Sequence, residues 1–143
     1  KVDVAAQLAE TAWAQTCSQC HGPMGRGDGP NGALVKAPDL TDADWQAKVS
    51  DQEIAQRIRA GKGLMPPNDL PDSTIAALVT RIRALRQRLN TYKEDLRTFA
   101  TIRADTARAT SLDEYSKAIS KWQTVKFAEA APSLKMLDTL LTE

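Results

Sequence analysis

Two cysteines and one histidine lie within five residues of each other, at Cys17, Cys20 and His21, and the chain of 143 residues contains no others. Two thiols three positions apart can each form a thioether with one vinyl group of a porphyrin, and the adjoining imidazole can bind the porphyrin's iron. The spacing C-x-x-C-H therefore predicts the covalent attachment of one haem c, with His21 as an iron ligand.

The same three residues are open to other interpretations. A Cys-x-x-Cys pair can act as a redox dithiol, but that use favours a βαβ pattern, which the surrounding sequence lacks. A zinc site needs four ligands, and the chain offers no further Cys or His. A disulfide across so tight a loop would leave His21 without a role. Haem attachment accounts for all three residues, and we favour it.

Composition narrows the functional classes. The formal net charge of +1 provides no dominant basic field for binding nucleic acid. No apolar run approaches the ~18–20 residues that are needed to span a bilayer. The chain begins Lys1-Val2-Asp3-Val4, which lacks the apolar stretch of a signal peptide. We expect a mature chain from which a leader has been removed.

Helical spacing dominates the sequence, which predicts an all-α protein. Residues 3–16 are expected to form a first helix with two apolar rows, Val4/Leu8/Ala12 and Ala5/Ala9/Trp13. Thr41 is expected to cap a short helix that contains Trp45. A capping box, Ser50 to Glu53, opens a further helix that ends at Gly61. Another helix begins at Asp72 or Ser73.

Two loops separate these helices. Five glycines and two prolines between positions 22 and 32 predict a loop, and its glycines are expected to let the backbone pass close to a flat cofactor. Residues 61–67, Gly-Lys-Gly-Leu-Met-Pro-Pro, can form neither a helix nor a central strand. This second loop places one thioether, that of Met65, at its middle.

Residues 1–88 resemble a class I cytochrome c. The resemblance is carried by the N-terminal helix, C-S-Q-C-H-G, the glycine-rich loop, P-D-L-T, the helix s-x-x-E-I, G-x-G-x-M-P-P and the closing helix I-A-A-L-V-T-R-I-R-A-L. In such proteins the first and last helices cross and the haem is enclosed with one edge exposed. The chain departs from this pattern at Arg81, where the family commonly has an aromatic residue.

The resemblance implies roles for six residues. Cys17 and Cys20 form the thioethers, His21 is the proximal iron ligand and Met65 is the distal ligand. Pro38 occupies the position whose carbonyl accepts a hydrogen bond from the ligand histidine. Trp45 either hydrogen-bonds a haem propionate or belongs to the core.

Met24 and Met136 are the other candidates for the sixth ligand. Met24 lies only three residues from His21, so the chain would have to reach the opposite haem face almost at once. Met136 lies in a helical stretch outside the resemblance. Family position and loop chemistry therefore favour Met65.

A histidine–methionine pair leaves no open position on the iron, and it raises the reduction potential. The resemblance therefore implies a single-haem electron carrier rather than an enzyme, with redox proteins such as a dehydrogenase or a terminal oxidase or reductase as partners. It also implies a periplasmic location, because haem is attached covalently on the outer side of energy-transducing membranes. The alternative is a haem enzyme or ligand sensor in which Met65 is labile.

The remaining residues predict a helical extension, so we divide the chain into a haem domain, 1–88, and an extension, 89–143. No Gly or Pro occurs between Pro71 and Pro132, so the last cytochrome helix is expected to continue to about residue 108. Its apolar seam follows a spacing of four and three: Leu78, Ile82, Leu85, Leu89, Tyr92, Leu96 and Phe99.

A second capping box, Ser111 to Glu114, predicts a returning helix, which makes a hairpin. The apolar face of this helix comprises Leu112, Tyr115, Ile119, Trp122 and Val125. Pro132 is expected to end this helix, and a last short helix is expected to carry Leu134, Leu137, Leu140 and Leu141. Because the seam extends beyond an ordinary cytochrome core, we expect a partner to cover it where the helix of residues 112–125 does not. The haem domain, a second copy and a partner protein are all open as the surface on which the extension packs. The extension is thus predicted to serve docking or homodimerisation.

Overall fold

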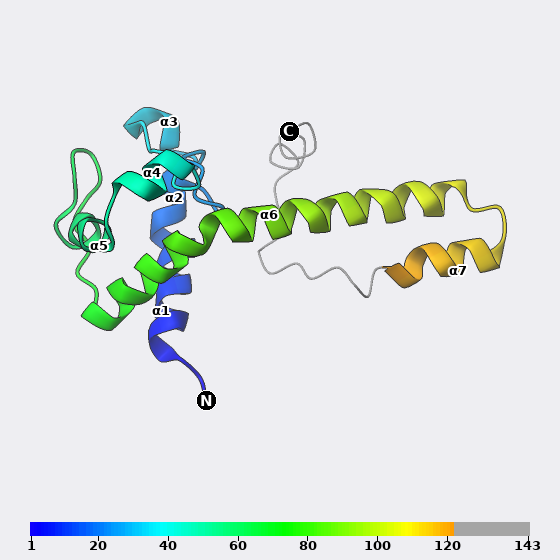
Figure 1. Cartoon of the computed structure of the whole chain (residues 1–143), viewed down its shortest axis with the longest axis horizontal. Helices are drawn as coiled ribbons and strands as arrows, with labels where there is room; N and C mark the ends of the chain where they lie inside the picture. Colours follow the sequence, from blue (N-terminus) through cyan, green and yellow to red (C-terminus); the bar gives the residue numbers. More distant parts are fainter. Residues whose placement is uncertain (122–143) are drawn as a thin grey trace. The chain divides into compact units, whose positions relative to one another are not determined.

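The computed structural model describes residues 1–121, and Figure 1 shows the chain. The chain divides into two compact units, Lys1–Arg88 and Leu89–Glu143, which are considered separately. Its helices are α1 (Val4–Ala12), the π-helix η1 (Trp13–Cys17), α2 (Ser18–His21), α3 (Gly32–Val35), α4 (Ala43–Lys48), α5 (Asp51–Ala60), α6 (Asp72–Arg108) and α7 (Leu112–Ser120). The all-α class is confirmed for the part of the chain described.

The first predicted helix extends further than expected and uses only one of its two apolar rows. The backbone stays helical from Val4 through η1 and α2 to His21. Ala9 and Trp13 are buried, whereas Val4 and Leu8 are 63% and 47% exposed. The row that contains Trp13 therefore faces the core. The wide π turn ends at Cys17, the first residue of the Cys-x-x-Cys-His motif, and such turns are frequent at functional sites.

The short helix around Trp45 is capped by a different residue from the one expected. Asp42, not Thr41, is the N-cap of α4, because its carboxylate accepts a hydrogen bond from the backbone N–H of Trp45 at 2.8 Å. Thr41 is buried instead, and its backbone N–H donates to Asp39 Oδ1 at 2.8 Å. The sequence offers two capping side chains in a row, and the tertiary packing of Thr41 decides between them.

The predictions for α5 and α6 are confirmed. The Ser50–Glu53 capping box opens α5, and Gly61 ends it with a left-handed φ of 74°. Helix α6 begins at Asp72 and runs without interruption to Arg108. In the first unit it contributes Ile75, Leu78, Val79, Ile82 and Leu85 to a core that also includes Ala9, Trp13, Leu40, Val49, Ile54 and Ile58.

The second unit is described from Leu89 to Lys121 and contains the C-terminal part of α6 and the returning helix α7 (Figure 1). Lys121 Nζ lies 3.0 Å from Asp105 Oδ2, so the predicted hairpin turn is present. Leu89, Tyr92 and Leu96 are no more than 6% exposed within this single chain. The expectation that a partner must cover the seam is therefore wrong for these three residues, whereas Phe99, the fourth, is only half-buried.

Helix α7 does not pack through its predicted apolar face. Its buried residue is Ala118, whereas Leu112, Tyr115 and Ile119 are 81%, 46% and 41% exposed. The side of α7 that carries Ala118 therefore faces inward, and the larger apolar residues face solvent. Trp122, Val125 and the predicted last short helix lie outside the described residues. No helix within residues 1–121 is long and apolar enough to cross a membrane.

Candidate functional site

A single cavity in the first unit collects all six residues that the sequence singled out. Its volume is about 510 Å³, within the range of cofactor sites. Apolar side chains, among them Leu40, Ile54, Ile58 and Ile82, make up much of its wall. The predicted site residues that line it are Cys17, Cys20, His21, Pro38, Trp45 and Met65.

The two thiols and the imidazole reach this cavity from one stretch of helical backbone. Cys17 is the last residue of η1, and Cys20 and His21 belong to α2, so spacings of three and four residues place all three on one side. Both cysteines are free thiols. Burial raises the pKa of the Cys17 thiol, and the positive charge of Arg81 partly opposes that effect. A disulfide is not needed to explain the motif.

His21 has a buried nitrogen that lacks a hydrogen-bond partner. Its Nδ1 is shielded from solvent, and no partner lies within reach among residues 1–121. Burial lowers the pKa of the imidazole, so the neutral form, which is the form that binds metals, is favoured. A buried polar atom without a partner calls for an explanation. A cofactor that binds the ring and orients it supplies one.

A bare metal ion does not fit this site. Within the described part of the chain, no group of three or more His, Cys, Asp or Glu side chains could hold one. The donor set in the cavity is instead two thiols, one imidazole and one thioether. These are the groups that a covalently attached haem requires, and the apolar wall suits a porphyrin.

Met65 lies in a loop that is tied down by backbone hydrogen bonds. The backbone N–H groups of Lys62 and Met65 each donate to the other residue's carbonyl at 3.0 Å. Beyond it, Asn68 anchors the loop to α5 through its backbone N–H, which donates to the Ile58 carbonyl at 3.0 Å. Met24 is 1% exposed and does not line the cavity. Met136 lies outside the described residues.

Gly27 explains how Pro38 comes to lie near His21. The backbone N–H of Gly27 donates to the His21 carbonyl at 2.8 Å. A Cβ on Gly27, whose φ is 76°, would lie 2.3 Å from the Ala37 carbonyl oxygen and 3.0 Å from that of Pro38. We expected the glycines to allow a cofactor to approach, whereas Gly27 allows the chain's own backbone to approach. The predicted hydrogen bond from His21 to Pro38 is not formed in the structure, because His21 Nδ1 has no partner among residues 1–121; that Pro38 accepts this bond when haem is bound stays a prediction.

The sequence did not predict that three cationic side chains would line the cavity. Lys36, Arg57 and Lys62 line it, although they lie in three different segments. Cations placed there suit the carboxylates of a porphyrin's propionates. No sequence signal marks them, because Lys and Arg are ordinary surface residues and only the fold brings these three together. Trp45 also lines the cavity, and its role stays a prediction.

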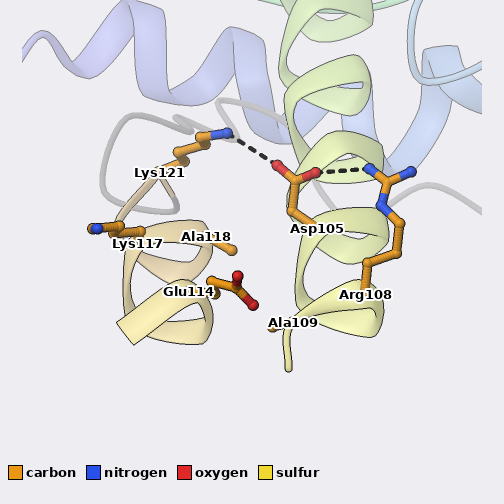
Figure 2. A pocket seen from close by; sticks show the side chains of 7 residues that line it. All are labelled: Asp105, Arg108, Ala109, Glu114, Lys117, Ala118 and Lys121. Atoms are coloured by element: carbon orange, nitrogen blue, oxygen red, sulfur yellow. Dashed lines mark hydrogen bonds and ion pairs between the residues drawn. The ribbon is translucent and has the colours of Figure 1, made fainter. Parts of the chain in front are cut away.

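The second unit contains a hollow of a different kind, which Figure 2 shows in close-up. It has a volume of about 370 Å³ and is lined by Asp105, Arg108, Ala109, Glu114, Lys117, Ala118 and Lys121. Asp105 pairs with both Arg108 and Lys121, at 2.9 and 3.0 Å. Glu114 accepts from the Thr110 backbone, and Lys117 pairs with Asp113. Every charged lining group is already paired, so we assign no ligand here.

Comparisons with known proteins bear on the first unit only. A family model described as "Cytochrome C oxidase, cbb3-type, subunit III" matches residues 4–80, more than half of the chain. The matched range contains all six predicted site residues and ends within α6. No curated protein and no solved structure matches the chain.

Proposed function

The chain belongs to the class I c-type cytochromes, which carry covalently attached haem c, and from this premise we propose that it is an exported one-electron carrier with a His21- and Met65-ligated haem. The observation that carries the proposal is the cavity. It gathers two free thiols, a thioether and an imidazole whose buried Nδ1 lacks a partner.

Each residue of the cavity has a distinct task in this proposal. Cys17 and Cys20 would hold the haem through thioether bonds, and His21 and Met65 would provide the ligands of its iron. When bound, haem supplies a centre that gains and loses one electron. The Pro38 carbonyl is proposed to accept from His21 Nδ1 once the ring is held by the haem, a hydrogen bond that the structure does not contain. Trp45 lines the cavity and packs against the core, and we propose that its indole N–H donates to a propionate; a purely structural role is the alternative.

Electron transfer is favoured over the alternative of an enzyme or ligand sensor, because those functions need an open or labile position on the iron. The paired hydrogen bonds between Lys62 and Met65, and the anchoring of Asn68 on α5, hold the thioether loop in place. A fixed distal ligand suits a carrier, whose two oxidation states should differ little in geometry. The protein's contribution is ligands, burial and a docking surface.

The redox partner is proposed to be a membrane-associated oxidoreductase, either a dehydrogenase or a terminal oxidase or reductase. The matched family is described as a subunit of a cbb3-type cytochrome c oxidase, which supports an oxidase complex. A periplasmic location follows from the site of covalent haem attachment in this family.

The extension is proposed to dock the protein to that partner. Its support is the apolar row Leu112, Tyr115 and Ile119, which stands exposed at spacings of three and four residues on α7. The buried seam of α6 gives no reason for a second copy. Light scattering of the wild type and of Tyr115→Glu tests for a homodimer. A smaller mass for the variant would show that the wild type forms a dimer through this row. Equal monomers with weakened oxidase turnover would support docking.

Spectroscopy tests the haem assignment. Acid–acetone extraction should leave all colour on the polypeptide, and the alkaline pyridine spectrum should be of c type. The ferric protein should be low-spin and show the long-wavelength sulfur-to-iron band, which Met65→Ala abolishes. Met24→Leu is the matched control, since a volume-conserving change of a buried residue outside the cavity should leave the band intact. A high-spin resting spectrum would instead support the enzyme or sensor.

A further inference from the structure

A buried cation lies beside the aromatic neighbour of His21. Arg81, in α6, is only 5% exposed, and its guanidinium carbon lies 4.2 Å from the centroid of the Trp13 ring. The planar guanidinium thus stacks on the indole, an arrangement that the point charge of a lysine does not reproduce. This is the position at which the family pattern commonly has an aromatic residue.

Arg81 pairs with an anion that lies nearer to solvent than Arg81 itself. Its Nε donates to Glu10 Oε2 at 3.0 Å, and Arg88 Nη1 donates to Glu10 Oε1 at the same distance. The side chain of Glu10 is 50% exposed, whereas that of Arg81 is 4% exposed, so water screens the anion more than the cation. The cation of this pair therefore lies deeper than its anion.

Trp13 connects this cation with the haem site. The centroids of the Trp13 and His21 rings are 6.2 Å apart, with 30° between their planes. The Trp13 Nε1–H donates to the Pro23 carbonyl at 3.2 Å, which holds the indole in place. Together the two separations put the guanidinium carbon within about 10 Å of the imidazole, through buried side chains where charges are poorly screened.

We propose that Arg81 is a charge that raises the reduction potential of the haem site, an inference that rests on the proposed electron-carrier function. Reduction brings one electron from the redox partner and lowers the positive charge of the site by one unit. A fixed cation stabilises the state of lower positive charge. Arg81 therefore favours the reduced protein, and Glu10 opposes it more weakly because it is exposed.

The proposal predicts opposite shifts for two substitutions on one ion pair. Arg81→Met removes the cation and keeps the apolar volume, so it should lower the potential. The equilibrium constant for reduction should fall by up to about tenfold, which for a one-electron couple is about 59 mV. Glu10→Gln removes the anion and should raise the potential by a smaller amount.

Two further variants serve as matched controls. Arg88→Met removes a guanidinium paired to the same carboxylate but not stacked on Trp13, so its shift should be smaller than that of Arg81→Met. Arg81→Lys keeps the charge and loses the stacking, so it should cost stability while leaving the potential near the wild-type value. Potentials are measured by spectroelectrochemical titration of the holoprotein.

The absorption spectrum separates the possible outcomes. If the sulfur-to-iron band persists in every variant and the two potentials move in opposite directions, Arg81 acts through its charge. Shifts of Arg81→Met and Glu10→Gln in the same direction, or an unmoved potential in Arg81→Met, would overturn the proposal while leaving the electron carrier intact. If Arg81→Met holds no haem, Glu10→Gln decides alone. A wild type without covalent haem would overturn both.

Discussion

Helix α6 belongs to both units of this chain, and it contributes to a different kind of structure in each. In the first unit, α6 supplies core residues to a set of short helices and loops that close around a cavity of about 510 Å³. In the second unit, α6 contributes the buried residues Leu89, Tyr92 and Leu96, and the hollow between α6 and α7 is lined by charges that already have partners. The candidate haem site is formed where loops are held by specific contacts. The helices described in the second unit contribute buried side chains and an exposed surface, but no candidate site.

The largest effect is expected in the loop after His21, where the first unit depends on specific backbone contacts. Gly27→Ala should cost about 3 kcal/mol or more, because a Cβ at φ 76° would collide with the Ala37 carbonyl, and a backbone atom cannot move aside cheaply. Haem yield should fall as well. Gly63→Ala is the control: its φ is 60°, but nothing lies within 4 Å, so we expect a cost of about 1 kcal/mol. Chemical denaturation of both holoproteins measures the difference, and equal costs would contradict the account of Gly27.

A core substitution in the hairpin should behave differently. Leu96 is 2% exposed, so Leu96→Ala should cost about 2–3 kcal/mol, seen by circular dichroism as earlier loss of helix. The haem absorption and the potential should not change. Leu112→Ala, at a residue 81% exposed, should stay within about 0.5 kcal/mol of the wild type. A change in the sulfur-to-iron band in Leu96→Ala would mean that the haem site depends on the hairpin.

Local signals in the sequence predicted much of this fold. The Ser50–Glu53 box, the end of α5 at Gly61 and the unbroken run of α6 to Arg108 are as expected. Each depends on capping or helix-breaking residues that act within one turn, so the sequence alone suffices. The motif Cys-x-x-Cys-His is found in the same way, whereas the prediction of Met65 rests on its position in the resembling family as well as on the chemistry of its loop. The fold brings them into one cavity.

Features that depend on tertiary contacts were missed. Asp42 rather than Thr41 caps α4, because the packing of Thr41 decides between neighbouring candidates. Helix α7 buries Ala118 and exposes Leu112, Tyr115 and Ile119, the reverse of what hydrophobicity alone predicts. The stacking of Arg81 on Trp13 joins residues 68 positions apart, and no local pattern predicts a buried arginine.

A smaller effect is expected at the start of α7. Ser111 accepts a hydrogen bond from the Glu114 backbone N–H at 3.2 Å, so Ser111→Ala should cost the hairpin about 1 kcal/mol. The matched change in the first unit is Ser50→Ala, with a similar cost. Helix loss in Ser111→Ala should leave the haem absorption band unchanged. A parallel loss of haem absorption would show that the haem site depends on the second unit.

Acid should weaken the same cap. Hydrogen bonds from the backbone and hydroxyl of Thr110 lower the pKa of the Glu114 carboxyl below its ordinary 4.5. Because the folded pKa is lowered, the stabilisation is complete above pH 4.5 and is lost as the pH falls through the lower folded value. Glu114→Gln should make helix content of the hairpin less sensitive to acid in this range. An unchanged acid titration would show that Glu114 is not the sensitive group.

The smallest effect on the haem is expected from the largest deletion. Every residue that lines the cavity lies at or before Ile82, and the cluster of Glu10, Arg81 and Arg88 is retained in a chain cut after Arg88. We therefore expect the cut protein to hold covalent haem with the same sulfur-to-iron band and the same potential. Its unfolding midpoint should fall only slightly, because the new end of α6 frays.

A second cut makes this test decisive. A chain that ends at Thr80 keeps all six predicted site residues but lacks Arg81, Ile82 and Leu85, the last two of which belong to the core of the first unit. It should hold haem poorly. Extraction and pyridine spectra of both truncated proteins measure the contrast. If the longer chain also fails, then the residues beyond Arg88 are part of what holds the haem, and the division into a haem unit and a separate hairpin is wrong. If it succeeds, the extension is free to serve a partner.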